Sequence, residues 1–173
     1  APYAGGAVGA FTREIEEALL DGRIDLAVHS MKDLPTEEHA GLAVVAVLPR
    51  RDPHDVLVTV GGEGLAGLPR GARVATGSPR RAGQMLHARP DLTMVPVRGN
   101  VDTRLLRFAE GACDALVLAR AGLARLGVRV PCSVIPYDVV LPAPAQGAVC
   151  VEARAGDRRM RALGRSLNHE PTA

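Results

Sequence analysis

Three different functional groups lie close together at residues 30–33, directly after an apolar stretch that predicts a strand. Ser30 carries a hydroxyl, Lys32 an ammonium and Asp33 a carboxylate, and Pro35 stiffens the chain that follows. A carboxylate in such a loop can transfer a proton or stabilise a developing cation, and the adjacent lysine favours its ionised form. Lys32 is also the only lysine of the chain, and arginine cannot supply its compact ammonium. An ordinary solvated turn explains the same spacing equally well.

A second group of candidate residues occupies 76–81 (TGSPRR), where a predicted strand turns directly into a predicted helix. Ser78 can cap this helix and Pro79 suits its first position, so the free backbone N–H groups favour an anion. Arg80 and Arg81 stand in the first turn, where they oppose the helix dipole unless an anion lies between them. This local conflict favours an anion-binding role over a plain surface pair.

A third group occupies 98–104 (RGNVDTR). Asn100 can cap the helix that follows, Gly99 admits close approach of a ligand, and Arg98 and Arg104 can reach the same place. Arg125, after the next strand, either joins them or lies on the surface. Several converging guanidiniums indicate a ligand with several carboxylates or phosphates. The absence of a P-loop argues against a nucleotide.

Cysteine and histidine spacing predicts no metal site. Cys113, Cys132 and Cys150 form no C-x-x-C pair and are expected to be small buried side chains at or near strands. The 5 histidines lack metal-ligand spacing and are expected to be structural or surface residues. No Ser, His and Asp arrangement can be argued either.

The elements that must position these loops follow from hydrophobic periodicity and breakers. A helix is predicted at 11–20, with Thr12 able to cap it and Asp21 and Gly22 ending it, before strands at 24–29 and 42–48. Alternation of strands and helices then predicts a parallel sheet. Its members are strands at 55–60, 73–77, 92–97 and 114–119 and helices at 79–89, 101–110 and 120–126. A strand at 148–152 and a helix around 158–167 end the chain.

Proline-rich segments near 49–53 and 142–147 indicate two crossings between lobes. A chain that leaves one α/β lobe, builds another and returns forms a two-lobed clamp, which binds small ligands in its cleft. We therefore expect domain 1 at 1–50 and 141–173 and domain 2 at 51–140.

Composition excludes several classes of function. The chain has 2 Tyr, 2 Phe and no Trp, which argues against base stacking. A net charge of +2 over interspersed acidic and basic residues indicates no nucleic-acid partner. No apolar run approaches the roughly 20 residues of a membrane span, and the first residues lack the basic region and apolar stretch that are typical of a signal peptide. These features predict a soluble cytoplasmic protein without a membrane partner.

Five segments resemble signature segments of the porphobilinogen deaminase (hydroxymethylbilane synthase) family in order and spacing. They are 27–35 (AVHSMKDLP), 76–81 (TGSPRR), 98–104 (RGNVDTR), 121–127 (AGLARLG) and 141–152 (LPAPAQGAVCVE). The resemblance implies a transferase of tetrapyrrole (heme) biosynthesis that joins porphobilinogen units head to tail into hydroxymethylbilane, with loss of ammonia. It also implies a dipyrromethane cofactor held through a cysteine, and an α/β fold of the two-lobed periplasmic-binding-protein type (type II) with two hinge crossings.

The resemblance assigns a catalytic role to Asp33, which would contact pyrrole N–H groups and stabilise the cationic azafulvene formed as ammonia leaves. The residues that would bind acetate and propionate side chains of cofactor and substrate are Ser30, Lys32, Thr76, Ser78, Arg80, Arg81, Arg98, Gly99, Arg104, Arg125 and Gln146.

The sequence departs from the family pattern at both ends. The family's N-terminal strand and helix and its third domain, with a Gly-Gly-Cys motif, have no counterpart, and Ala7 and Val8 stand where some relatives carry a lysine. No cysteine has a matching context, so none is assigned to the cofactor. We expect a monomeric fragment of a longer deaminase, with an incomplete first lobe and no activity alone. The alternative is a non-catalytic anion-binding module, which would gain nothing from a carboxylate at Asp33.

Overall fold

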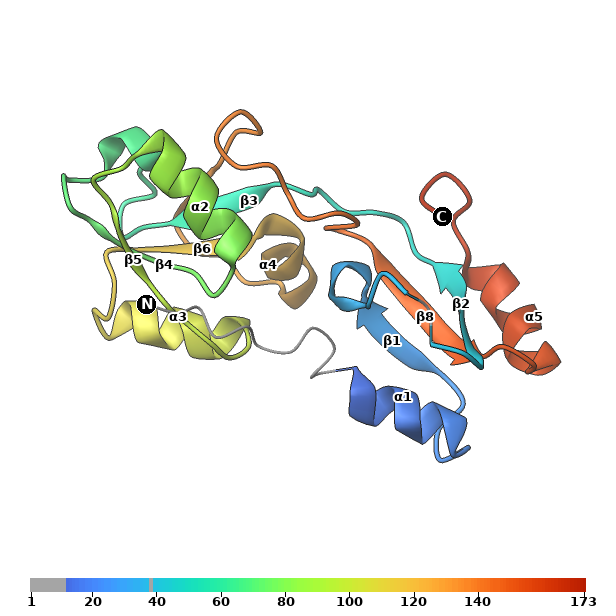
Figure 1. The fold of residues 1–173 in the computed structure, drawn as a ribbon. Helices are drawn as coiled ribbons and strands as arrows, with labels where there is room; N and C mark the ends of the chain where they lie inside the picture. The colour runs from blue at the N-terminus through green and yellow to red at the C-terminus, as the bar shows by residue number, and fades with distance from the viewer. Residues whose placement is uncertain (1–11, 38) are drawn as a thin grey trace. The chain divides into compact units, whose positions relative to one another are not determined.

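The computed structural model describes residues 12–37 and 39–173, which form two compact units of mixed helix and strand (Figure 1). Unit 1 comprises the described residues up to Arg51 together with Ala145–Ala173, and unit 2 comprises Asp52–Pro144. The loop containing Ala7 and Val8 and the first residue of the first predicted helix, Phe11, lie outside the described residues. Within the described residues, no helix has the length and apolar character needed to cross a membrane.

Unit 1 is built on a three-stranded sheet in the order β1-β8-β2. The central strand runs antiparallel to both neighbours. The elements of unit 1 are α1 (Arg13–Leu20), β1 (Ala27–Ser30), the 3-10 turn η1 (Met31–Asp33), β2 (Leu42–Val47), β8 (Val149–Arg154) and α5 (Arg158–Leu167).

Both helices of unit 1 pack on this sheet through small or apolar side chains. Leu19 of α1 is fully buried in a cluster with Ala27 and Leu42. On α5, a Cβ at Gly164 would overlap the carbonyl oxygen of Val45, so the glycine permits the close approach of helix and strand.

Unit 2 contains a five-stranded sheet in the order β5-β4-β6-β3-β7. Its elements are β3 (Asp55–Val58), the 3-10 turn η2 (Leu65–Gly67), β4 (Arg73–Ala75), α2 (Pro79–Ala88), β5 (Thr93–Val95), α3 (Val101–Ala109), β6 (Ala115–Ala119), α4 (Arg120–Leu126) and β7 (Cys132–Val134).

The prediction of a parallel sheet is correct for β4, β5 and β6 and wrong for β3. β4 pairs in parallel with both β5 and β6, whereas β3 is antiparallel to β6 and β7. β4 follows β3 in the sequence but is separated from it in the sheet by β6. The segment between them has only the short turn Leu65–Gly67, so the helical crossover that joins parallel strands is missing there. The edge strand β7 was not predicted, because three residues with two exposed side chains give too short a pattern.

The core of unit 2 lies on both faces of its sheet, which explains the continuous apolar runs of its strands. On one face, Leu57 and Val117 pack with Met85 of α2. On the other face, Leu116 and Leu118 pack with Leu123 of α4 and with side chains of α3. The helices that follow β4, β5 and β6 are thereby fixed against the sheet, and the loops that precede them are held at its edge.

Candidate functional site

In unit 1 the candidate residues gather where β1 ends and η1 begins. Ser30 precedes the turn Met31–Asp33, and its side chain and that of Asp33 are exposed. Lys32 donates from Nζ to Oε1 of Gln146 at 3.3 Å. Gln146 is 1% exposed, and its backbone carbonyl accepts a hydrogen bond from Nε of Arg50 at 2.9 Å. The structure therefore joins Lys32 to Gln146, which follows it by 114 residues, and leaves the Asp33 carboxylate accessible.

In unit 2 the second group is organised by the start of α2. Ser78 is the N-cap residue, its Oγ accepts from the backbone N–H of Arg81, and Pro79 occupies the first helical position as predicted. Thr76 is fully buried, and its Oγ1 accepts from the backbone N–H of Ser78 at 3.2 Å. A Cβ at Gly77 would stand 2.6 Å from the carbonyl oxygen of Val97. The loops after β4 and β5 therefore lie against each other, as expected for neighbouring parallel strands.

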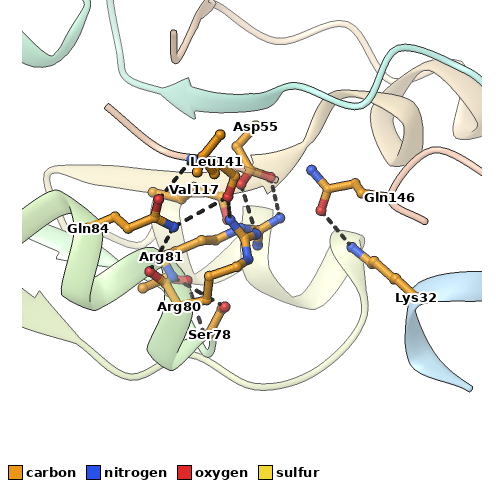
Figure 2. A network of polar contacts seen from close by, with 10 residues as sticks. Lys32, Asp55, Ser78, Arg80, Arg81, Gln84, Val117, Leu141 and Gln146 are labelled. Atoms are coloured by element: carbon orange, nitrogen blue, oxygen red, sulfur yellow. Dashed lines mark hydrogen bonds and ion pairs between the residues drawn. The ribbon is translucent and has the colours of Figure 1, made fainter. Parts of the chain in front are cut away.

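The two arginines of α2 share one buried carboxylate (Figure 2). Arg81 donates from Nη2 to Oδ1 of Asp55 at 2.6 Å and from Nη1 to the carbonyl of Val117 at 3.4 Å. Arg80 donates from Nη2 to Oδ2 of the same aspartate at 3.0 Å. The side chain of Asp55 is 0% exposed. Asp55 thus supplies the anion that two guanidiniums in the first turn of a helix require.

Arg80 and Gln84 also bind the backbone of Leu141, near the end of unit 2. Arg80 donates from Nη1 to the carbonyl of Leu141. Gln84 donates from Nε2 to that carbonyl at 3.3 Å and accepts from the N–H of Leu141 at 2.9 Å. The first two turns of α2 therefore hold the segment that leads back toward unit 1.

Charge and hydrogen bonding in this cluster leave capacity for an anionic ligand. Two guanidiniums and one carboxylate give a net charge of +1. Among the described residues, Nε of Arg81 is buried without a hydrogen-bond partner, although burying an unpaired donor is costly. The cluster can therefore accept a carboxylate of a ligand.

The third group lies between β5 and α3. Gly99 has φ +107°, a conformation that favours glycine, and its carbonyl accepts from Nε of Arg104 at 2.8 Å. Asn100 caps α3 as predicted, accepting from the N–H of Thr103 at 2.9 Å. Arg98 is exposed, whereas Arg125 lies in the last turn of α4, beyond the start of that helix.

The cysteines differ in their exposure. Cys113 and Cys150 are buried as expected, and burial raises the pKa of the Cys150 thiol to about 11. The expectation is wrong for Cys132, which is exposed because it lies on the edge strand β7. In the described part of the chain, no group of His, Cys, Asp and Glu side chains could hold a metal ion.

The residues that sequence reasoning missed are the partners of the arginines. Asp55 opens an apolar strand (DVLV), and a carboxylate in such a strand requires a buried counter-charge. That signal indicates that Asp55 has a cationic partner but not which one, since Arg81 lies 26 residues away. Gln84 gives no signal of its role, because it contacts backbone atoms of Leu141.

Comparison with known sequences shows the family of this chain. Residues 3–162 match the family described as "Porphobilinogen deaminase, dipyromethane cofactor binding domain". The chain is 58% identical over 163 residues to a porphobilinogen deaminase of Rubrobacter xylanophilus, covering 94% of this chain and 53% of the relative. It is 55% identical over 169 residues to that of Moorella thermoacetica, covering 97% and 54%. The chain spans about half the length of these curated relatives.

The comparison with solved structures concerns the fold. A putative methionine-binding lipoprotein of Bacillus subtilis superposes with a TM-score of 0.58 at 13% identity, covering 92% of this chain and 76% of that protein. A periplasmic substrate-binding protein of Coxiella burnetii superposes with a TM-score of 0.57 at 16% identity, covering 90% of this chain and 76% of that protein. These likenesses confirm the predicted α/β fold of the two-lobed periplasmic-binding-protein type.

Proposed function

The chain belongs to the porphobilinogen deaminase family, and from this premise we propose that it serves a transferase of tetrapyrrole biosynthesis. The reaction joins porphobilinogen units head to tail into hydroxymethylbilane and releases ammonia. The observation that carries the proposal is the cationic cluster at the start of α2, where Arg80 and Arg81 exceed their single carboxylate Asp55 by one charge. Porphobilinogen carries an acetate and a propionate side chain, and guanidiniums bind such groups.

The residues present fit the family's dipyrromethane cofactor. The unpartnered buried Nε of Arg81 offers a donor to an anion, and the other candidate side chains of unit 2 add cationic or hydroxyl groups. When bound, this cofactor supplies the pyrrole chain to which new rings are joined. The residues proposed to bind carboxylates of cofactor and substrate are Ser30, Lys32, Thr76, Ser78, Arg80, Arg81, Arg98, Arg104, Arg125 and Gln146, with Gly99 allowing close approach.

The proposed catalytic group is the Asp33 carboxylate. It is exposed in η1 beside Lys32, whose ammonium is directed to Gln146. From this position Asp33 accepts a hydrogen bond from a pyrrole N–H and stabilises the positive charge that develops as ammonia leaves. A receptor for polyanions would be weakened by a carboxylate in its site, so Asp33 favours the enzyme over the binding module.

We also propose that the two units are the first two domains of the enzyme, and that it is a cytoplasmic monomer. Its described cysteines are all free thiols, which is typical of a reducing compartment.

The test is calorimetric titration of porphobilinogen into the 173-residue chain and its Asp33→Asn variant. The chain covers about half of its relatives' length. The test therefore measures the binding of porphobilinogen and not its turnover. Arg98→Gln should weaken binding about 10-fold, because it removes a charge-assisted contact. Asp33→Asn should retain binding within a few-fold. Absence of binding by the unmodified chain contradicts the proposal, and tighter binding by Asp33→Asn would favour the anion-binding module.

A further inference from the structure

We propose that Asp55 is a positioning residue, which holds Arg81 permanently and Arg80 reversibly in the anion site. This inference rests on the proposed function, because it gives the two arginines different tasks in binding one ligand. Asp55 itself is buried in β3, with a side chain that is 0% exposed. It therefore acts on a ligand through the guanidiniums and not by contact.

Arg81 has no freedom to leave its position. Its side chain is 6% exposed, and its two terminal nitrogens donate to Asp55 and to the carbonyl of Val117. A buried guanidinium that loses its carboxylate would be left as an uncompensated charge. The Arg81–Asp55 pair is accordingly a fixed part of the site, with one donor, Nε, left over.

Arg80 has a different environment. Its side chain is 26% exposed, and it shares Asp55 with Arg81 and the Leu141 carbonyl with Gln84. Both acceptors keep a hydrogen-bond donor if Arg80 turns away, since Arg81 still binds Asp55 and Gln84 still binds Leu141. A ligand carboxylate can therefore take over the Arg80 guanidinium without leaving a buried acceptor unpaired.

For the replacement of Asp55, this arrangement predicts a change in porphobilinogen affinity opposite to the change that net charge alone predicts. Removing a carboxylate beside an anion site raises its positive charge, which alone should tighten the binding of porphobilinogen. If Asp55 positions both guanidiniums, its replacement by asparagine should weaken that binding, because an amide has a single oxygen to offer two guanidiniums. Asp55→Asn therefore separates a positioning role from a role in setting charge.

The first measurement needs no ligand and uses ¹⁵N NMR of the arginine side chains. In the unmodified chain, the terminal nitrogens of Arg80 and Arg81 should give separate signals, because their pairing restricts rotation. In Asp55→Asn these signals should broaden or merge. Asp91→Asn is the matched control, because Asp91 holds Arg89 through two hydrogen bonds at 2.8 and 2.9 Å in the same unit. It should change the signals of Arg89, which keeps its hydrogen bonds to the carbonyls of Leu65 and Leu68, and leave those of Arg80 and Arg81 unchanged.

The second measurement is porphobilinogen affinity by calorimetry. Asp55→Asn should bind about 10-fold more weakly and Asp91→Asn as the unmodified chain does. Added porphobilinogen should shift the Arg80 signals and leave the Arg81–Asp55 pair intact. If Asp55→Asn does not fold, Asp55→Glu replaces it: this variant keeps the charge but moves it by one methylene, and it should also bind more weakly.

The outcomes distinguish this proposal from the proposed function. Unchanged guanidinium signals in Asp55→Asn, or equal or tighter binding by the substituted chain, overturn the role of Asp55. A chain that binds no porphobilinogen contradicts the proposed function, and the NMR comparison then still decides whether Asp55 positions the arginines.

Discussion

The two units each bury a cluster of charged side chains, and the clusters have opposite compositions. In unit 2, two guanidiniums surround the carboxylate of Asp55. In unit 1, the imidazole of His29 lies 3.2 Å from the carboxylate of Glu152, and Glu16 of α1 is buried nearby. The first cluster has an excess of cations that cannot lose their protons. The second has two carboxyl groups, of Glu152 and Glu16, beside one imidazole.

This difference indicates which cluster serves a ligand and which serves the fold. The guanidiniums keep their charge at any physiological pH and lie at the start of a helix, where they can meet an anion. In unit 1, burial raises the pKa of the Glu152 carboxyl, with the positive charge of His29 opposing that rise and the negative charge of Glu16 adding to it. The unit 1 cluster lies under α1 and joins β1 to β8, so its titration affects the stability of the sheet.

The largest effect that would test this difference between the two clusters is expected at Asp55. Asp55→Ala leaves two guanidiniums, one of them buried, without a carboxylate, and should lower the free energy of unfolding by about 3–5 kcal/mol. Urea denaturation measures this loss. The control is Asp91→Ala. The Asp91 side chain is 24% exposed, against 0% for Asp55, so its removal should cost about 1 kcal/mol or less. Equal losses in the two variants would contradict a special role for the buried cluster.

A smaller effect, with a dependence on pH, is expected at Glu152. The pKa of this carboxyl is raised in the folded protein. The protonated Glu152 side chain therefore adds to the free energy of unfolding at pH values below the ordinary carboxyl pKa. That contribution is lost as pH rises through the raised pKa. Glu152→Gln removes the titration, so the variant should become more stable relative to the unmodified chain as pH rises.

Urea midpoints measured from about pH 4 to about pH 8 would test this prediction across the range of carboxyl titration. The Asp91→Asn variant provides the comparison, because the hydrogen bond from Arg89 holds the pKa of the Asp91 carboxyl well below its usual range, so this group stays ionised throughout. A difference between Glu152→Gln and the unmodified chain that stays constant with pH would rule out titration of Glu152 as the cause.

The smallest effect on stability is expected at Arg98. Its side chain is exposed, so Arg98→Gln should change the free energy of unfolding by no more than about 0.5 kcal/mol. The same variant is expected to weaken porphobilinogen binding. Parallel measurement of unfolding and affinity would show whether a residue can serve the ligand and leave the fold unaffected, in contrast to Asp55.

Local sequence signals predicted much of the structure. The helix expected around 158–167 is observed as Arg158–Leu167, and Ser78 and Asn100 cap their helices as expected. These features depend on a few neighbouring residues, for which capping and periodicity are direct physical causes.

Features that depend on distant residues were not predictable from the same signals. The direction of β3 is set by pairing with β6 and β7, and the partner of Arg81 lies 26 residues away. The sequence places an aspartate in an apolar strand and two arginines in a helix, but only the folded sheet brings them together. The anion expected between the arginines therefore has a source within the protein.

The central position of β8 in unit 1 has a consequence for the order of folding during translation. β1 and β2 both pair with β8, which leaves the ribosome only after all of unit 2 has been made. Unit 2 is continuous in the chain and can fold while its neighbour still lacks its middle strand. We expect the nascent chain to acquire its arginine cluster before its first sheet closes, and the newly made N-terminal strands to be the segment most in need of a chaperone.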